Sequence, residues 1–230
     1  MTEQEKFFVY INELVDQLSE RPADQAFANP EECAILSVDL TNAFAREGNL
    51  ASPRVVAIIQ PIIKLMQKAW DLGVKNIILA QDCHTSTAEE FDAFALHAVC
   101  GTSEAEAVDE IKALPFYDQM TIFEKNSINP AQNTGLNEWI QAYPEVKTFV
   151  VVGDCTDLCI YQTAMHLRTF ANSKDLDWRI LVPANCVDTY HLSVEDAKAI
   201  GAVPHDGDLL HKLFLYHMAL NAVEVVKEIV

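Results

Sequence analysis

Short apolar runs alternate with stretches of helical periodicity along most of the chain. The run CAILSVDL at 33–40 is almost continuously apolar and ends in a carboxylate, as expected of a strand that is buried on both faces. Between this run and later ones of the same kind, apolar residues recur every three or four positions. The pattern predicts strands at 33–40, 76–82, 120–125, 148–154 and 179–186, and helices at 53–72, 132–142, 156–171, 193–200 and from about 208 onward.

This alternation determines the expected fold class. Near-continuous apolar strands separated by helices are typical of a parallel sheet that is covered on both faces and joined by right-handed crossovers. We therefore expect a three-layer α-β-α fold of the α/β class, with a mostly parallel sheet of five or six strands flanked by helices. Residues 222–226, AVEVV, form either a last strand or more of the final helix.

Residues 1–30 are expected to form an amphipathic helix and a connecting loop, ahead of one domain at 31–230. Thr2 and Glu5 have the spacing of a capping box. One helical face carries an apolar stripe, made of Phe7, Ile11, Leu14, Val15 and Leu18. This face either docks on the domain or makes a contact between subunits, which would make the protein a homo-oligomer.

The composition excludes several classes of function. Half of the 230 residues are apolar, so the chain can bury a substantial core. A net charge of −18 argues against binding to nucleic acid, which favours a basic surface. No stretch approaches ~20 uninterrupted apolar residues, which argues against a membrane protein, and the first residues lack the pattern of a secretion signal. We expect a cytoplasmic protein whose partner is a small molecule or another protein.

Six cysteines in a chain of this length do not form a dense disulfide framework, and most of them lie in apolar surroundings. We therefore expect reduced thiols at all six positions. These are Cys33, Cys83, Cys100, Cys155, Cys159 and Cys186.

Polar side chains gather where the predicted strands end. In parallel α/β sheets the working site lies beyond the carboxyl ends of the strands. Asp39, Asp82 with His84, Lys125 and the turn at 153–159 all follow such ends. We therefore expect them to converge on one edge of the sheet.

The segment VVGDCTDLC, residues 151–159, carries two of the cysteines. Cys159 lies close to the N-terminus of the predicted helix, where N–H groups and the helix dipole lower the pKa of a thiol and can stabilise an oxyanion. Cys155 is the competing nucleophile, and either residue could instead be a small buried hydrophobe. A redox or metal pair fits less well, because the spacing is C-x-x-x-C and no second pair follows.

A thiol nucleophile needs a base and a group that stabilises charge. Asp39 and Lys125 each end a predicted strand, so both could reach the thiol. A carboxylate beside a lysine is more often a plain salt bridge, but its place on the same sheet edge as the cysteine favours catalysis.

One Asp and two His could form a metal site. Asp82 and His84 are two positions apart at a strand end and therefore share a face, and His97 lies downstream in a polar loop. This ligand set suits zinc, iron or manganese and leaves coordination positions open. Alternatively, Asp82 caps a loop and the histidines are surface groups, since D-x-H is common by chance.

Four motifs together resemble a known family. VDLTNAF (38–44), QDCH (81–84) with His97, FEKN (123–126) and VVGDCTDLC (151–159) resemble, in order and spacing, the isochorismatase-like cysteine hydrolases. Among these, the nicotinamidases are the most similar. The resemblance runs from about residue 33 to the C-terminus and implies the isochorismatase-like hydrolase fold.

The resemblance also implies roles for particular residues. Asp39, Lys125 and Cys159 would form the catalytic triad. A cis peptide bond between Asp154 and Cys155 would aim the N–H groups of Cys155 and Cys159 into an oxyanion hole. A non-proline cis bond costs about 3 to 4 kcal/mol, so the surrounding structure must enforce it.

Nicotinamidases also hold one divalent ion, which takes the pyridine nitrogen of the substrate. The resemblance implies Asp82, His84 and His97 as its ligands, with Glu90 as a further carboxylate in some members. Zinc is the first choice, and iron and manganese are the others. Phe44 resembles a residue that, in nicotinamidases, packs on the pyridine ring of the substrate.

The implied reaction is the hydrolysis of nicotinamide to nicotinate and ammonia through a cysteine thioester, in NAD salvage. The chain departs from the family at Ile128, where nicotinamidases commonly carry an aromatic residue in the substrate pocket. This departure keeps open a second hypothesis, a related amidohydrolase that acts on another small amide or a carbamoyl compound. A third, a catalytically silent binding or assembly protein, is disfavoured by the intact Asp39, Lys125 and Cys159.

Overall fold

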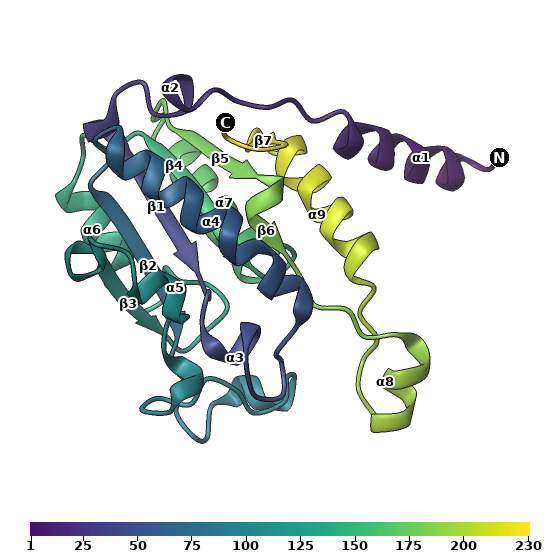
Figure 1. The fold of residues 1–230 in the computed structure, drawn as a ribbon. Coiled ribbons are helices and arrows are strands. Elements are labelled where there is room, and N and C mark those ends of the chain that lie inside the picture. Colours follow the sequence, from purple (N-terminus) through teal and green to yellow (C-terminus); the bar gives the residue numbers. More distant parts are fainter.

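Seven strands form one sheet between two layers of helices (Figure 1). The computed structural model describes all of residues 1–230. The strands are β1 (Cys33–Val38), β2 (Asn76–Asp82), β3 (Thr121–Lys125), β4 (Thr148–Asp154), β5 (Arg179–Pro183), β6 (Val187–Asp188) and β7 (Glu224–Val226). The helices are α1 (Glu3–Asp16), α2 (Ala23–Ala26), α3 (Asn42–Ala45), α4 (Pro53–Asp71), α5 (Asp109–Lys112), α6 (Leu136–Ala142), α7 (Cys159–Ser173), α8 (Val194–Ile200) and α9 (Gly207–Leu220). All strand pairs are parallel, in the order β3-β2-β1-β4-β5-β7, and β6 pairs with β4.

The three-layer α/β fold is therefore confirmed, but the expected number of strands, five or six, is wrong. The prediction for 179–186 joins two strands that the structure separates: β5 ends at Pro183, which has no N–H to donate, and a 3-10 turn leads on to β6. The segment at 222–226, which the pattern leaves open, contains β7. Strands of two or three residues are too short to show a hydrophobic pattern of their own.

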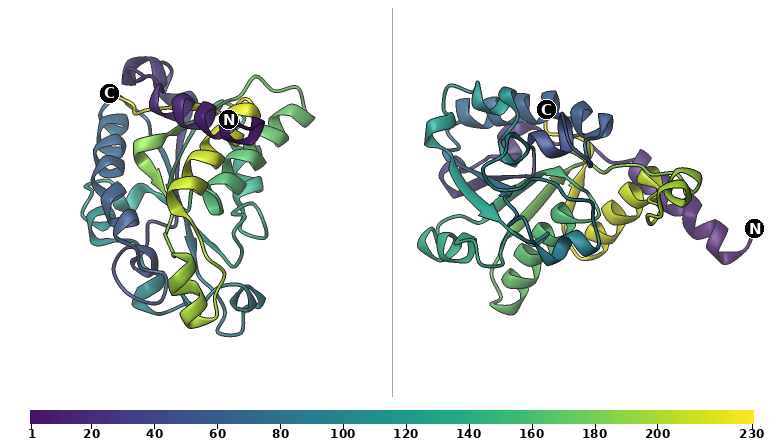
Figure 2. Two further views of the ribbon diagram at one scale, coloured as in Figure 1. Left: turned by 90° about the vertical axis from the view of Figure 1, so that its right-hand side faces the viewer. Right: turned by 90° about the horizontal axis from the view of Figure 1, so that it is seen from below.

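Alternate side chains of each strand enter different parts of the core. In β1, Ile35 packs in the cluster that includes α4, whereas Leu36 and Val38 pack in the cluster that includes α6, α7 and α9. Figure 2 shows α4 on one face of the sheet and α7 with α9 on the other. Because both faces are covered there, β1, β2, β4 and β5 are buried almost throughout.

Two helices begin later than predicted. The helix expected at 132–142 begins at Leu136, because Gly135 has a left-handed φ of 94°. The helix expected at 156–171 begins at Cys159, because the preceding residues form a tight turn in which Ile160 N donates to Cys155 O at 3.1 Å. Cys159 is thus the first residue of α7.

Helix α1 extends away from the sheet and packs beside α9 (Figures 1 and 2). The predicted capping box is present, since Thr2 Oγ1 accepts a hydrogen bond from Glu5 N at 3.2 Å and Glu5 accepts one from Thr2 N at 2.7 Å. Ile11 is the buried residue of the helix. Phe7 and Tyr10, which are 43% and 52% exposed, present ring edges to Tyr216 on α9. A role of this face in a homo-oligomer stays a prediction.

None of the helices combines the length and the apolar character needed to cross a membrane.

The strand register brings the polar strand ends together. Asp82 pairs with Lys125 across β2 and β3, and Val38 pairs with Gly153 across β1 and β4. Asp39 N, one residue past β1, donates to Ala80 O at 2.9 Å. Asp39, Asp82 and Lys125 therefore end neighbouring strands at the same edge, as the sequence pattern predicts.

β1 and β4 approach each other unusually closely at Gly153. Its φ is +115°, and a Cβ built there would lie 1.9 Å from the carbonyl oxygen of Val38. Only glycine adopts this conformation without strain. The contact fixes the position of the turn that leads from β4 to Cys159.

Gly153→Ala is expected to lower the free energy of unfolding by at least about 3 kcal/mol, because the methyl group collides with backbone that cannot move aside. The control is Gly101→Ala, where φ is +80° and nothing lies within 4 Å of the added Cβ. There we expect only the cost of a left-handed alanine, about 1 to 2 kcal/mol. Denaturant titration of both variants measures the difference, and equal losses would contradict the prediction.

Candidate active site

Lys125 lies at the centre of a buried polar cluster. Its Nζ is 2.8 Å from Asp39 Oδ2 and 2.5 Å from Asp82 Oδ1, and it donates to Cys159 Sγ at 3.6 Å. Asp39 Oδ1 accepts a hydrogen bond from Asp82 N at 2.8 Å. All four residues are at most 6% exposed. The structure thus brings together the three residues that the sequence suggests for the triad.

Burial determines the protonation of this cluster. Burial and the charge of Asp82, opposed by Lys125, raise the pKa of Asp39 to about 6. Burial also raises the pKa of the Cys159 thiol well above its usual range, although Lys125 counteracts it. Loss of solvent thus outweighs the lowering of the pKa that is expected from the helix N-terminus. The resting thiol is protonated and needs a base. Carboxylates of Asp39 and Asp82 both lie within 4.8 Å of the sulfur, and Asp39, whose pKa is raised to about 6, is the suitable proton acceptor.

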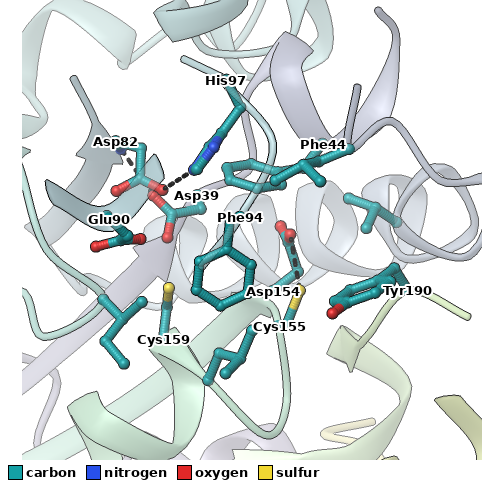
Figure 3. Close-up of a pocket in the computed structure, with 14 residues that line it drawn as sticks. Asp39, Phe44, Asp82, Glu90, Phe94, His97, Asp154, Cys155, Cys159 and Tyr190 are labelled. Carbon is teal, nitrogen blue, oxygen red and sulfur yellow. Dashed lines mark hydrogen bonds and ion pairs between the residues drawn. The ribbon is translucent and has the colours of Figure 1, made fainter. Parts of the chain in front are cut away.

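Of the two cysteines in the turn, only Cys159 is part of this cluster. Ligand atoms of Asp39, Asp82 and Cys159 lie within 4.8 Å of one another. The Cys155 thiol instead donates to Asp154 Oδ2 at 3.7 Å (Figure 3). The peptide bond between Asp154 and Cys155 is cis, as the resemblance implies.

Asp82, His84 and His97 place their ligand atoms within 4.8 Å of one another. The Nδ1 atoms face away from the cluster: that of His84 pairs with Asn126 Oδ1 at 2.9 Å, and that of His97 with Ala95 O at 2.8 Å. Both rings thereby direct Nε2 towards Asp82. This arrangement is typical of metal-binding histidines.

The donor set fits a divalent ion. His84 Nε2 is buried and has no hydrogen-bond partner, although it lies 3.3 Å from Asp82 Oδ1. An unpaired buried nitrogen is costly unless a ligand satisfies it. Glu90 Oε1 is 3.9 Å from the same nitrogen. This carboxylate therefore lies next to the cluster of Asp82, His84 and His97 without being part of it. Two imidazoles and a carboxylate are a known zinc set that leaves a position open.

Cys83 and Cys100 form a disulfide, so the expectation of six reduced thiols is wrong for this pair. The backbone brings them together: His84 N donates to Ala98 O, and Cys100 N donates to His84 O, both at 2.9 Å. The sequence gives no sign of this pairing, because it lies outside the predicted strands. The other cysteines are free and buried, as expected.

An apolar pocket opens beside Cys159 (Figure 3). Phe44 and Ile128 line it, as do Asp39, Asp82, Glu90 and His97. Much of its wall is not predicted from the sequence, namely Leu50, Val55, Phe94, Asp154, Leu158 and Tyr190. Asp154 and Leu158 lie within the VVGDCTDLC motif, whereas the others come from loops and helix ends that carry no recognisable signal.

Comparison with known proteins assigns the chain to a family. Residues 33–206 match the family described as the Isochorismatase domain. The chain belongs to the isochorismatase family. It is 26% identical over 212 residues to Nicotinamidase 1 of Arabidopsis thaliana, with 85% of each chain covered.

Solved structures share the fold of this isochorismatase-family protein. N-carbamoylsarcosine amidase from Thermoplasma acidophilum is 21% identical with a TM-score of 0.64, covering 85% of this chain and 96% of its own. Pyrazinamidase of Pyrococcus horikoshii, solved in complex with zinc, is 20% identical with a TM-score of 0.65, covering 85% and 99%. These likenesses agree with the three-layer fold described above.

His97→Ala is expected to reduce bound metal from about one ion per chain to a tenth or less, because only two close ligands remain. Metal content after dialysis, measured by elemental analysis, tests this independently of activity. The control is His166→Ala on α7, whose ring pairs with Asn137. If His97→Ala keeps its metal while folded, the assignment of the ligands is wrong.

Replacing both Cys83 and Cys100 by Ser is expected to lower the free energy of unfolding by about 3 kcal/mol, since the bond closes a loop across a sequence separation of 17 residues. Denaturant titration under oxidising conditions measures the loss. A reductant should destabilise the wild type equally and leave the double variant unaffected. The prediction fails if the two proteins are equally stable without reductant.

Proposed function

We propose that the protein is a nicotinamidase, which hydrolyses nicotinamide to nicotinate and ammonia. The observation that carries the proposal is the shared pocket, in which a buried thiol touching Lys125 lies beside the Asp82–His84–His97 cluster. The thiol can attack a carboxamide while the cluster holds a heteroaromatic ring. Such an activity would return the pyridine ring to the synthesis of NAD.

In the first half of the reaction, Asp39 accepts the proton of the Cys159 thiol. A carboxylate whose pKa is about 6 is a suitable base near neutral pH. The Lys125 ammonium, 3.6 Å from the sulfur, stabilises the thiolate as it attacks the carboxamide carbon. The backbone N–H groups of Cys155 and Cys159 stabilise the oxyanion, with each donor contributing about 3 to 4 kcal/mol.

In the second half, the carbon–nitrogen bond breaks and Asp39 returns its proton to the departing ammonia. A water molecule that gives its proton to Asp39 then attacks the thioester. Nicotinate leaves and Cys159 recovers its proton. Throughout, Lys125 remains between Asp39 and Asp82, so the base keeps its position.

The cluster of Asp82, His84 and His97 would hold a divalent ion, with zinc favoured and iron or manganese as alternatives. When bound there, such an ion would supply a Lewis acid for the pyridine nitrogen of the substrate. Glu90 lies close enough to join the ligands directly or through water. Phe44 and Ile128 line the same pocket and would pack on the ring.

A second candidate is the hydrolysis of another small amide or carbamoyl compound by the same chemistry. Ile128 supports it, because an aliphatic side chain gives a flat ring less stacking surface than an aromatic one. The fold similarity to an N-carbamoylsarcosine amidase is in keeping with this alternative.

Cys159→Ala is expected to reduce ammonia release from nicotinamide at least about 10⁴-fold, because no nucleophile remains. Ammonia and nicotinate are measured on protein whose metal content is known. If the metal-loaded wild type releases no ammonia from nicotinamide, the substrate must be another amide. Full activity in Cys159→Ala would refute the thioester mechanism altogether.

Two further variants separate the roles of the cysteines. Cys155→Ala keeps the backbone N–H that the mechanism uses, so it should lose far less activity than Cys159→Ala. Cys186→Ala removes a buried thiol that lies outside the pocket and controls for the loss of a core sulfur. If Cys155→Ala is as inactive as Cys159→Ala while folded, the assignment of the nucleophile must be revised.

A further inference from the structure

Asp154 is a buried acid that the mechanism does not use. It is the last residue of β4, is fully buried and lines the same pocket as Cys159. Its Oδ1 atom has no hydrogen-bond partner, and its Oδ2 atom accepts only a long hydrogen bond of 3.7 Å from the Cys155 thiol. Most buried polar atoms in proteins are hydrogen-bonded. This carboxyl therefore requires an explanation.

No cation neutralises Asp154. The nearby Lys125 ammonium already contacts Asp39, Asp82 and Cys159. Burial, with the charges of Asp39 and Asp82, raises the pKa of Asp154 well above its usual range. Burial therefore favours the protonated carboxyl, which has one O–H donor. Because Asp154 Oδ2 accepts the hydrogen bond from the Cys155 thiol, the proton of the carboxyl group belongs on Oδ1, which has no partner.

The side chains that line the pocket with Asp154 include Phe44, Leu50, Val55 and Leu158, which have no acceptor. Asp39 and Tyr190 also line it, but Asp154 Oδ1 makes no hydrogen bond to either of them. The backbone holds the side chain in this direction, because Gly153 packs closely against the backbone of Val38 and Asp154 pairs with Asp188 of β6. An apolar residue would be more stable at this position than an acid without a partner. A ligand that enters the pocket with an acceptor can satisfy this carboxyl.

The position of Asp154 shows which part of a ligand it meets. In Figure 3 it lies between Cys155 and Phe44, on the opposite side of the pocket from Asp82 and Glu90. A substrate held at the metal cluster and attacked by Cys159 has its carboxamide next to the turn that Asp154 begins. The substrate atom nearest Asp154 is thus one beside the carboxamide, remote from the atom held at the cluster.

We propose that Asp154 determines specificity by donating a hydrogen bond to an acceptor adjacent to the carboxamide of the substrate. The preferred substrates are heteroaromatic carboxamides that carry a ring nitrogen or a hydroxyl oxygen at that position. Nicotinamide has only C–H groups beside its carboxamide and leaves Asp154 unpaired. This inference rests on the proposed amide hydrolysis in this pocket and adds a second polar contact to it.

Nicotinamide and pyrazinamide are matched probes, since pyrazinamide has a nitrogen in place of one C–H next to the carboxamide. The quantity to measure is the ratio of kcat/KM for pyrazinamide to kcat/KM for nicotinamide. Asp154→Leu is expected to lower this ratio about tenfold, because the donor is lost. Asp154→Asn retains a donor of the same shape and should keep the ratio within about threefold.

Leucine is larger than aspartate and could crowd the pocket. Asp154→Ala removes the donor without adding volume, so the same ratio of kcat/KM is measured for it. Thermal melting verifies that each variant is folded. A ratio that is the same in the wild type and in the apolar variants would overturn the inference, although nicotinamide hydrolysis would still stand.

Binding tests the inference without turnover. Calorimetry with metal-loaded Cys159→Ala, alone and combined with Asp154→Leu, gives the affinities for both amides. If the wild type hydrolyses neither amide but Asp154→Leu still lowers the relative affinity for pyrazinamide about tenfold, the inference holds and the proposed reaction is wrong. Failure of both amides to bind would overturn the inference as well.

Discussion

The buried ammonium of Lys125 connects every part of the site. It is in contact with the carboxylates of Asp39 and Asp82 and with the thiol of Cys159, and it is shielded from solvent. A buried charge of this kind is stable only when it is paired, and removal of one partner from such a pair typically costs about 3 to 5 kcal/mol. Through Asp82 the same ammonium is linked to the two histidines. The catalytic and metal-binding halves of the pocket therefore form one electrostatic unit.

The sheet register makes this unit possible. Lys125 and Asp82 are paired residues of β3 and β2, and the hydrogen bond from Asp39 N to Ala80 O places the base beside them. A slip of one residue in either strand would move these side chains to the opposite face of the sheet. The apolar clusters on the two faces prevent such a slip, because it would expose core residues to polar neighbours. The hydrophobic core thus determines the geometry of the charged site.

The sequence predicts those parts of the protein that depend on local pattern. The bounds of β2 and β4 agree with the apolar runs, and the four strand ends that carry Asp39, Asp82, Lys125 and the cysteine turn meet as expected. The resemblance contributes the cis bond at Asp154. What depends on distant contacts is missed. The disulfide follows from a short backbone pairing beside His84, and the pocket walls come from loops whose order arises only in the folded state.

The pKa of Cys159 illustrates the same limit in energetic terms. Position at the start of a helix is visible in the sequence and favours a thiolate, whereas the extent of burial is not visible and outweighs it. The consequence for catalysis is that negative charge moves from Asp39 to the sulfur only when Asp39 takes the proton, inside an apolar pocket where every electrostatic contact is strong. Apolar walls hold a ring without fixing its direction, so the few polar groups must orient the substrate. For a substrate with an acceptor beside its carboxamide, the proposed contacts of the histidine cluster and of Asp154 act at opposite ends, and the carboxamide can meet Cys159 in only one orientation.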